Sequence, residues 1–334
     1  MSEKIIRFGI IGAGSIGSLF GGALADIQPS ESSIKMDFFG RKAHIDAINK
    51  SGLKFEKDQK VRIIQNISGY EGSKNYLEQR GSSSVGFNFL FLCTKTYDIE
   101  SAMVEYKPLI EKTNYLVVLQ NGIGNEDIIK EYCEKEKILR IVTSNGALLK
   151  EPGHVIHTGS GFTKVGLFFK KVMKNNQGKL KQIDADLAIL KNLLDFAGFK
   201  TTIVEDIGSE CWQKVFVNVG INPFGALTGL KNGELLEVEG LRELMGEAVK
   251  EAIRVAEKKE IDLPQTDMIA VMYDVARKTA KNKNSMLQDV LKGKRTEIDF
   301  INGRIVKYAQ ELGLKVSINR SLTVLVKGLE YKNR

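Results

Sequence analysis

A glycine-rich turn near the start of the chain restricts the fold of its first half more than any other feature. Residues 9–18 read GIIGAGSIGS, which gives Gly12, Gly14 and Gly17 the spacing G-x-G-x-x-G between an apolar run and a stretch of small residues. In a strand–turn–helix, Gly12 allows the tight turn, Gly14 lets a pyrophosphate approach the backbone, and Gly17 lets the helix pack closely. The pattern therefore predicts a dinucleotide site at a helix N-terminus. Its candidate cofactor-binding residues are Gly12, Gly14, Ser15, Ile16 and Gly17.

Strand and helix patterns alternate after this turn. The runs FNFLFLCT at 87–94 and YLVVLQ at 115–120 are continuously apolar, which is typical of parallel strands buried on both faces. Further strands are predicted at 5–11, 34–39, 138–142, 155–157, 164–169 and 200–204, and helices at 15–24, 42–49 and 182–196. This alternation predicts an α/β fold with a mostly parallel sheet, extended by antiparallel strands and ending in an edge strand at 200–204.

The character of the chain changes after about residue 206. Apolar residues then recur at i, i+3, i+4 and i+7, the spacing of one helix face. Helices of this kind are predicted at 241–256, 268–276, 298–312 and 322–329. We therefore expect a cofactor-binding domain at residues 1–206 and an all-α domain at 207–334.

Composition narrows the class of protein. Of the 334 residues, 43% are hydrophobic and 27% charged, which is a globular balance. The net charge of +8 comes from lysines spread along the chain, so we expect anionic small-molecule ligands and no nucleic-acid partner. No apolar stretch approaches the roughly 18 residues of a membrane span, and the first residues lack the apolar core of a signal peptide. We predict a cytoplasmic protein with no membrane partner.

Cysteine and histidine are scarce. The three cysteines lie far apart without a C-x-x-C pair, which argues against a disulfide framework and favours a reducing compartment. None of His44, His154 and His157 has the spacing and acidic neighbours of a metal site, so we expect no metal and interpret them as ordinary polar positions.

A polar stripe marks the start of the helical half. Lys214, Asn218 and Asn222 are spaced i, i+4 and i+8, which places them on one helix face opposite large apolar residues. An amine in line with two amides suits the wall of a site for a small polar ligand; a partly exposed stripe with i,i+4 bonds is the alternative. Pro223 disfavours helical conformation at the residue before it, so we expect the helix to end there.

The choice of dinucleotide depends on the end of the second predicted strand. An NAD site usually has an acidic residue about 20 positions after the glycines, where it binds the ribose hydroxyls. Asp37 is at that distance but lies inside the strand, whereas Arg41 follows at its carboxyl edge. Because a guanidinium can pair with a 2′-phosphate, we favour NADP(H). The alternative is that Arg41 is a solvated first-turn residue.

Polar residues also follow the next two predicted strands. Lys95 comes directly after the run at 87–94, and Asn121 after the run at 115–120. Ligands of open α/β sheets bind at the carboxyl edge, so both residues are predicted near the ligand.

A second group of polar residues follows later in the helical half. Ser285 and Glu297 flank an apolar patch. By spacing alone, Thr296 and Glu297 can equally be a helix cap and a favourable first-turn charge.

Together, these motifs resemble those of the ketopantoate reductase (2-dehydropantoate 2-reductase) family. The matching segments are the glycine turn, Lys214-x-x-x-Asn218-x-x-x-Asn222-Pro223, Asn232-Gly233-Glu234-Leu235, and the stretch SMLQD…TEID…NG from Ser285 to Gly303. The last stretch is the most specific. The resemblance implies a Rossmann-type domain that binds NADPH, a helical domain that closes over it, and an active site in the cleft. It also implies reduction of the 2-keto acid ketopantoate to (R)-pantoate, a step of pantothenate biosynthesis.

The resemblance assigns a role to each matching residue. Lys214 is implied as the general acid at the ketone oxygen, where hydride transfer leaves negative charge, and Glu297 as the carboxylate that partners the site. A carboxylate near Lys214 would oppose the fall in pKa that burial causes. The implied substrate-binding residues are Asn218, Asn222, Asn232 and Ser285, and the implied cofactor-side residues are Arg41, Lys95 and Asn121.

Two departures from the family pattern leave the keto acid open. Asn284 stands where a second serine is common, and Gly225 replaces a frequent threonine. The first alternative is therefore an NADP-dependent reductase of another branched 2-keto acid. An alternative from another class is a non-catalytic NADP-binding sensor, which would not need a proton donor. β-Hydroxyacid dehydrogenases share Lys-x-x-x-Asn but lack the SMLQD…TEID stretch. The sequence leaves the oligomeric state open, a homodimer being one option.

Overall fold

The computed structural model describes residues 4–30, 32–81, 86–173 and 176–332, which form two compact units. The first contains the chain up to Gln120 and Glu126–Ile207, and the second contains Asn121–Asn125 and the chain from Gly208 onward. Within these residues, none of the helices has the length and hydropathy needed to cross a bilayer.

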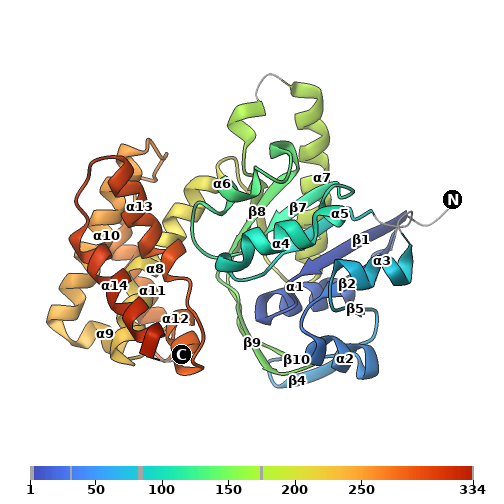
Figure 1. Ribbon diagram of the computed structural model, residues 1–334, viewed down its shortest axis with the longest axis horizontal. Coiled ribbons are helices and arrows are strands. Elements are labelled where there is room, and N and C mark those ends of the chain that lie inside the picture. The colour runs from blue at the N-terminus through green and yellow to red at the C-terminus, as the bar shows by residue number, and fades with distance from the viewer. Residues whose placement is uncertain (1–3, 31, 82–85, 174–175, 333–334) are drawn as a thin grey trace. The chain divides into compact units, whose positions relative to one another are not determined.

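An eight-stranded sheet forms the centre of the first unit (Figure 1). Its strands are β1 (Lys4–Ile11), β2 (Ser32–Phe39), β5 (Ser68–Tyr70), β6 (Phe89–Leu92), β7 (Tyr115–Val118), β8 (Ile138–Thr143), β11 (Thr163–Leu167) and β12 (Thr201–Ile203). They lie in the order β12-β11-β8-β7-β6-β1-β2-β5, parallel from β8 to β5, with β11 antiparallel to β8. The predicted mostly parallel sheet, its antiparallel addition and its edge strand β12 are confirmed.

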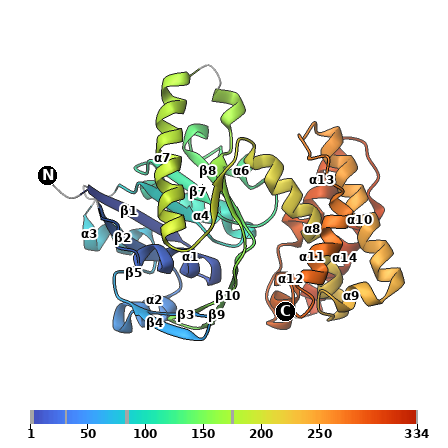
Figure 2. The ribbon, with the colours of Figure 1, turned by 180° about the vertical axis from the view of Figure 1, so that it is seen from behind.

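Helices cover both faces of this sheet. They are α1 (Ser15–Ala25), α2 (Lys42–Ser51), α3 (Ser73–Arg80), α4 (Ile99–Glu105), α5 (Lys107–Ile110), α6 (Asn125–Ile129) and α7 (Gln177–Phe196), with 3-10 turns η2 (Thr96–Asp98), η3 (Lys135–Lys137) and η4 (Lys170–Met173). Figure 2 shows α7 crossing the near face of the sheet. Side chains of α1, α7 and alternate residues of β1 and β2 share one core. On the other face, Phe39 packs against the rings of Tyr70, Tyr76, Phe87 and Tyr106.

A second, four-stranded sheet was not predicted. It consists of β3 (Leu53–Lys57), β4 (Lys60–Ile64), β9 (Gly146–Glu151) and β10 (His154–Gly159), in the order β4-β3-β10-β9. Of these strands only β10, expected at 155–157, was foreseen. Four of the five residues of β4 are exposed and none of β9 is buried, so neither strand has an apolar run that would identify it.

His44 joins this sheet to the main one. The buried His44 ring accepts a hydrogen bond at Nδ1 from the Gly153 N–H (2.9 Å), and its Nε2 lies 3.0 Å from Ser18 Oγ. Burial lowers the pKa of His44 to about 4, so the ring is neutral at physiological pH. The expectation of an ordinary polar position understates its role, because the ring connects α1, α2 and the β9–β10 turn.

The second unit is helical, as predicted. Its elements are α8 (Ile207–Thr228), α9 (Glu234–Glu237), α10 (Glu239–Lys258), α11 (Met268–Lys278), α12 (Ser285–Leu291), the 3-10 turn η5 (Ile298–Phe300), α13 (Asn302–Glu311) and α14 (Ser317–Lys332). The continuous helix expected at 298–312 is wrong, since Ile301, with φ −109° and ψ −97°, separates η5 from α13. Helix α14 begins earlier than expected.

The predicted end of α8 at Pro223 is also wrong. The helix continues through Pro223 to Thr228. A proline removes the hydrogen bond to the carbonyl four residues earlier, which is Val219 O. Here the Asn302 side chain donates to that carbonyl from 3.4 Å, which replaces part of the lost bonding.

Candidate active site

The glycine turn fits the predicted phosphate site. Gly12 has φ +85°, and a Cβ there would come within 2.6 Å of the Thr94 nitrogen. A Cβ on Gly17 would come within 2.5 Å of Gly12 O, whereas one on Gly14 would meet nothing nearer than 4.0 Å. The first and third glycines are thus required by packing inside the unit, and the second borders open space at the start of α1. N–H groups of a first helical turn have no acceptor within the helix, so they suit a phosphate.

Ser15 and Ile16 begin α1 next to this turn, and both are half-buried. The Ser15 hydroxyl oxygen accepts a hydrogen bond from the Leu149 N–H of β9 at 3.1 Å. The Ser15 side chain is therefore engaged in anchoring β9, and its backbone N–H remains the group suited to a phosphate.

The turn lies where the order of the sheet reverses. Strand β1 has β2 on one side and β6 on the other, and ligands of open α/β sheets bind at such a switch point. Lys95 follows β6 at the same carboxyl edge as the turn and is half-buried. Gln120 braces this edge, because its side-chain amide donates to both the carbonyl and the hydroxyl oxygen of Thr94 at 2.9 Å.

Arg41 lies exposed at the end of β2 and Asp37 lies buried inside it, as their positions in the sequence predict. Arg41 precedes α2 at the carboxyl end of β2, and its guanidinium is exposed. Within the described chain this guanidinium makes no hydrogen bond or ion pair, so it is available to an anion. Asp37 is buried inside β2, where Tyr76 OH donates to it (3.4 Å) and Arg80 lies 3.9 Å away. Burial outweighs the attraction of Arg80 and raises the pKa of Asp37 to about 6.

Within the second unit, Lys214, Asn121 and Glu297 form a chain of hydrogen bonds. The Lys214 ammonium donates to Asn121 Oδ1 at 2.8 Å, and Asn121 Nδ2 donates to Glu297 Oε2 at 3.0 Å. An ammonium can only donate and a carboxylate can only accept, so the orientation of the Asn121 amide is determined. The structure therefore places Asn121, expected on the cofactor side, between the two residues expected to carry the acid chemistry.

The segment Asn121–Asn125, which reads NGIGN, is shaped to reach Glu297. Gly122 has φ +83°, and a Cβ there would lie 2.4 Å from the Phe300 carbonyl oxygen. The Ile123 N–H donates to that oxygen at 3.2 Å, and the fully buried Asn125 donates to the Asn121 carbonyl at 3.0 Å. These contacts hold Asn121 against η5 and the residue before it, Glu297.

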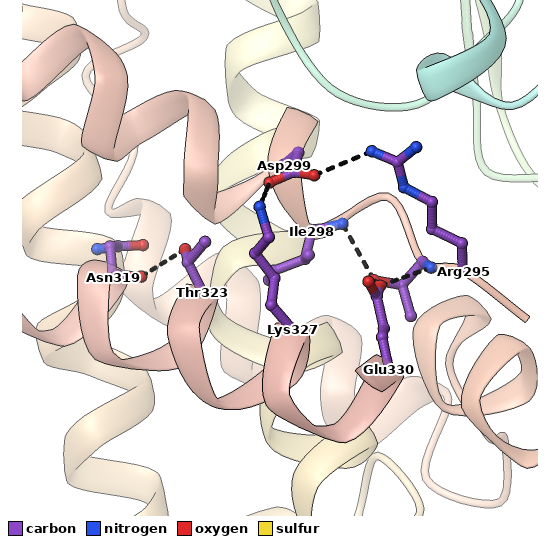
Figure 3. Close-up of polar contacts among 8 residues, drawn as sticks. Arg295, Ile298, Asp299, Asn319, Thr323, Lys327 and Glu330 are labelled. Atoms are coloured by element: carbon purple, nitrogen blue, oxygen red, sulfur yellow. Dashed lines mark hydrogen bonds and ion pairs between the residues drawn. The ribbon is translucent and has the colours of Figure 1, made fainter. Parts of the chain in front are cut away.

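Helix α14 fixes the residues on both sides of Glu297 (Figure 3). Glu330 Oε1 accepts from Thr296 N at 2.7 Å and from Thr296 Oγ1 at 2.6 Å, and Thr296 is 1% exposed. Thr296 Oγ1 also accepts from Ile298 N at 3.2 Å, a local contact across Glu297, which is the residue that precedes η5. Asp299 forms ion pairs with Lys327 and Arg295. The expected helix cap at Thr296 is wrong, because Glu297 takes the N-cap position of η5 and the Thr296 side chain is bonded to Glu330.

Four other residues were expected to bind substrate. Asn218 and Asn222 lie on α8 with Lys214, and neither side chain makes a hydrogen bond within the described chain. Ser285 is the exposed first residue of α12. Asn232 is buried, and its amide donates to Thr279 Oγ1 at 2.9 Å. Asn218, Asn222 and Ser285 can therefore hydrogen-bond a ligand without breaking a bond of the fold. The Asn232 amide already makes a hydrogen bond within the fold.

The two departures from the family pattern are neighbours in space. A Cβ on Gly225 would lie 2.1 Å from Asn284 Nδ2. The Asn284 amide contacts Ile221 O and Asn232 Oδ1, both at 3.5 Å, and its oxygen caps α12 by accepting from Leu287 N at 3.0 Å. Asn284 thus occupies space that a larger residue at position 225 would need, which makes the two departures one coupled change.

Comparisons with known proteins identify the family. Residues 8–169 match the family model described as "Ketopantoate reductase PanE/ApbA", and residues 206–330 match its "C terminal" counterpart. A 2-dehydropantoate 2-reductase from Pyrococcus horikoshii is 36% identical over 96% of each chain. One from Archaeoglobus fulgidus is 34% identical over 98% of this chain and 99% of the other. The chain belongs to the ketopantoate reductase family.

Solved structures agree with this membership. A PanE/ApbA family ketopantoate reductase from Ralstonia eutropha JMP134 superposes with a TM-score of 0.81 at 26% identity, over 98% of this chain and 99% of the other. A D-mandelate dehydrogenase in a ternary structure with NADH and anilino(oxo)acetate has a TM-score of 0.84 at 25% identity over the same shares. The α/β fold with a Rossmann-type sheet and a helical second part is thus that of the ketopantoate reductase family.

The residues that support this site have no recognisable signal in the sequence. Glu330, Asn319 and Glu251 lie far along the chain from the residues that they contact, so no spacing pattern relates them. Asn302 lies in the NG pair that ends the stretch from Ser285 to Gly303, but nothing in that pair indicates its contact with Val219 O. Elsewhere, no three His, Cys, Asp or Glu side chains gather as a metal-binding group in the part of the chain that the structure describes.

Proposed function

We propose that this chain catalyses the NADPH-dependent reduction of ketopantoate to (R)-pantoate. The observation that carries the proposal is the Lys214–Asn121–Glu297 chain of hydrogen bonds. It is supported by curated relatives named 2-dehydropantoate 2-reductase that match nearly the whole chain.

Lys214 is proposed as the general acid. Reduction of a ketone places negative charge on its oxygen, which is lowered in energy by a proton donor or a fixed positive charge. An ammonium has three donors, so Lys214 can hold Asn121 and donate a proton to a substrate oxygen as well. The Asn121 amide connects this ammonium to the oppositely charged Glu297 carboxylate. After each turnover Lys214 regains its proton from solvent.

The cofactor is proposed to bind the first unit. The open space beside Gly14 and the first-turn N–H groups of α1 suit a pyrophosphate, and Arg41 suits a 2′-phosphate. When bound, the nicotinamide supplies the hydride. Lys95 is proposed as a further cofactor-side residue, at the carboxyl edge of β6.

The substrate is proposed to bind along α8. Asn218 and Asn222 continue the face of Lys214, and Ser285 adds a hydroxyl. These neutral groups can hold the hydroxyl and carboxylate oxygens of a small 2-keto acid without adding charge beside the general acid. Asn232 would contribute indirectly, because it contacts Asn284.

The direct test is NADPH oxidation by the purified protein with ketopantoate. Loss of a general acid costs about 10²–10⁴-fold in rate, so we expect Lys214→Ala to lower kcat by about three orders of magnitude while NADPH still binds. Lys250→Ala is the matched control, because Lys250 is a surface lysine of the same unit that pairs with Glu247, and it should keep wild-type turnover. A kcat for Lys214→Ala within tenfold of wild type would remove Lys214 from this role.

Reduction of a different 2-keto acid is the second candidate. It is favoured by the D-mandelate dehydrogenase structure, whose ligand is anilino(oxo)acetate, and by the coupled change at Gly225 and Asn284. A panel of ketopantoate, 2-ketoisovalerate and phenylglyoxylate separates the two, since the physiological class should show the highest kcat/KM. NADPH binding without turnover on any of them would favour a sensor. The cytoplasmic location and the homodimer stay predictions.

A further inference from the structure

A proline interrupts the hydrogen bonding of α8 directly after Asn222, the last residue of its polar face. Pro223 has no N–H, so the Val219 carbonyl lacks the donor that a regular helix would provide at this position. Val219 is fully buried, and water cannot serve as a replacement. A buried carbonyl without a donor is costly, so the fold must supply one from elsewhere.

Asn302 supplies that donor. Its Nδ2 lies 3.4 Å from Val219 O and 3.0 Å from Asn319 Oδ1, and its side chain is fully buried. Both neighbours are acceptors, so the amide group must point its NH₂ toward them. Asn302 Oδ1 has no hydrogen-bond partner within the described residues, which means that the orientation is imposed by the neighbours of Nδ2.

Asn319 is itself held rigidly. Its Nδ2 donates to Glu251 Oε2 at 2.8 Å and to the Ala248 carbonyl at 2.9 Å, which leaves Oδ1 directed at Asn302. The Glu251 carboxylate also accepts the N–H groups of Ile318 and Asn319 in the first turn of α14, at 3.1 and 3.0 Å. A carboxylate at a helix N-terminus is favourable, so α10 and α14 form a fixed support for the Asn302 amide.

The position of this amide relates it to the proposed chemistry. Val219 follows Asn218 directly and precedes Asn222 by three residues, while Lys214 lies on the preceding turns of the same helix. On the other side, Asn302 begins α13 immediately after the segment that contains Glu297 and η5. One side chain therefore connects the Glu297 segment to the interrupted turn of α8.

We propose that Asn302 is a positioning residue for the reaction: by donating to the carbonyl that Pro223 leaves without a partner, it keeps Asn218, Asn222 and Lys214 in register with Glu297. The proposal rests on the proposed function for its catalytic consequence. The hydrogen-bond relay itself does not depend on that function.

A double-mutant cycle tests the relay. Asn302→Leu removes the donor and keeps the branched shape of the side chain, and we expect it to lower kcat by about 10–100-fold with little change in KM for NADPH, because a misplacement of about 1 Å in a site can cost that much. Pro223→Ala gives residue 223 an N–H that can reach Val219 O within the helix. In the Pro223→Ala background, Asn302→Leu should therefore lower kcat by less than about threefold, since the carbonyl already has its donor.

The readouts separate the possible outcomes. Equal losses of kcat in the two backgrounds would overturn the proposal, and so would a loss expressed only in KM for NADPH. Hydrogen exchange of the α8 amides, followed by mass spectrometry, provides a readout without turnover: Asn302→Leu should speed exchange around Val219 only where Pro223 is present. If the wild-type protein reduces no 2-keto acid, the proposed function fails and this exchange measurement alone decides the relay. Asn302→Ser serves if Asn302→Leu does not fold: its shorter side chain withdraws the donor from Val219 O, so the amides around Val219 should exchange faster only in the presence of Pro223.

Discussion

The two hydrogen bonds between Glu330 and Thr296 allow a quantitative prediction. Glu330 lies near the end of α14, and its carboxylate accepts both the N–H and the O–H of the buried Thr296, the residue before Glu297. Glu330→Ala removes Oε1, the one oxygen that accepts both bonds, and takes this acceptor away from two buried donors. Glu330→Gln keeps one acceptor oxygen of the same geometry and removes only the charge.

The magnitude follows from the type of bond. A hydrogen bond to a charged group contributes about 1.5–3 kcal/mol, and a neutral one about 0.5–1.5 kcal/mol. Glu330 is only half-buried, so water replaces part of what Glu330→Ala removes, and we expect that variant to lose about 2–3 kcal/mol of unfolding free energy. A negative charge near a helix C-terminus is unfavourable by about 0.3–1 kcal/mol. Glu330→Gln removes this unfavourable charge, which offsets part of the weakened hydrogen bonding. Its unfolding free energy should therefore fall by at most about 1 kcal/mol.

The single tryptophan makes the measurement specific. Trp212 is buried in α8, in the same unit as Glu330, so its fluorescence during urea unfolding reports on that unit. Glu311→Ala, at the exposed end of α13, is the matched control and should change the unfolding free energy by less than about 0.5 kcal/mol. We also expect Glu330→Ala to lower kcat more than Glu330→Gln. Equal stability of the two Glu330 variants would refute the argument that these bonds hold the Glu297 segment.

Three further predictions follow from the same structure. Arg41→Ala should raise KM for NADPH at least tenfold more than KM for NADH, as measured by initial rates with each cofactor; equal losses would mean that Arg41 does not contact the 2′-phosphate. Gly225→Ala should destabilise the second unit by about 1–3 kcal/mol in the Trp212 assay, because its Cβ meets Asn284, and Asn284→Ser should restore most of that loss. An additive result would refute the coupling. The pKa of Asp37 is about 6 in the folded protein against an ordinary value of 3.8. Protonated Asp37 therefore stabilises the fold below pH 3.8, and this contribution is lost as the pH rises through 6. Between pH 4 and pH 7, the unfolding free energy of Asp37→Asn should therefore rise relative to that of the wild type by up to about 3 kcal/mol, as measured by unfolding followed by circular dichroism. A difference that stays constant with pH would contradict the raised pKa.

Local sequence patterns were sufficient to predict the strands and helices that form the core of each unit. The buried parallel strands β6 and β7 have continuous apolar runs, and α10 has a regular apolar face, so period and length identified them. Strand β4 was missed because most of its side chains are exposed. The end of α8 was misplaced because the effect of Pro223 on the helix depends on Asn302, a residue distant in the sequence.

The same division applies to the site. Lys214, Asn218 and Asn222 could be grouped from the sequence because helical spacing alone places them on one face. The glycine turn could be assigned because its three glycines and flanking strand and helix are contiguous. A contact such as Lys214 with Asn121, or Thr296 with Glu330, joins residues whose separation along the chain carries no period. Such hydrogen bonds form only where folding brings distant segments of the chain together, so only the tertiary structure could show them. The sequence by itself therefore determined which side chains are available for chemistry, and the packing of distant segments determined which of them are held together and by what.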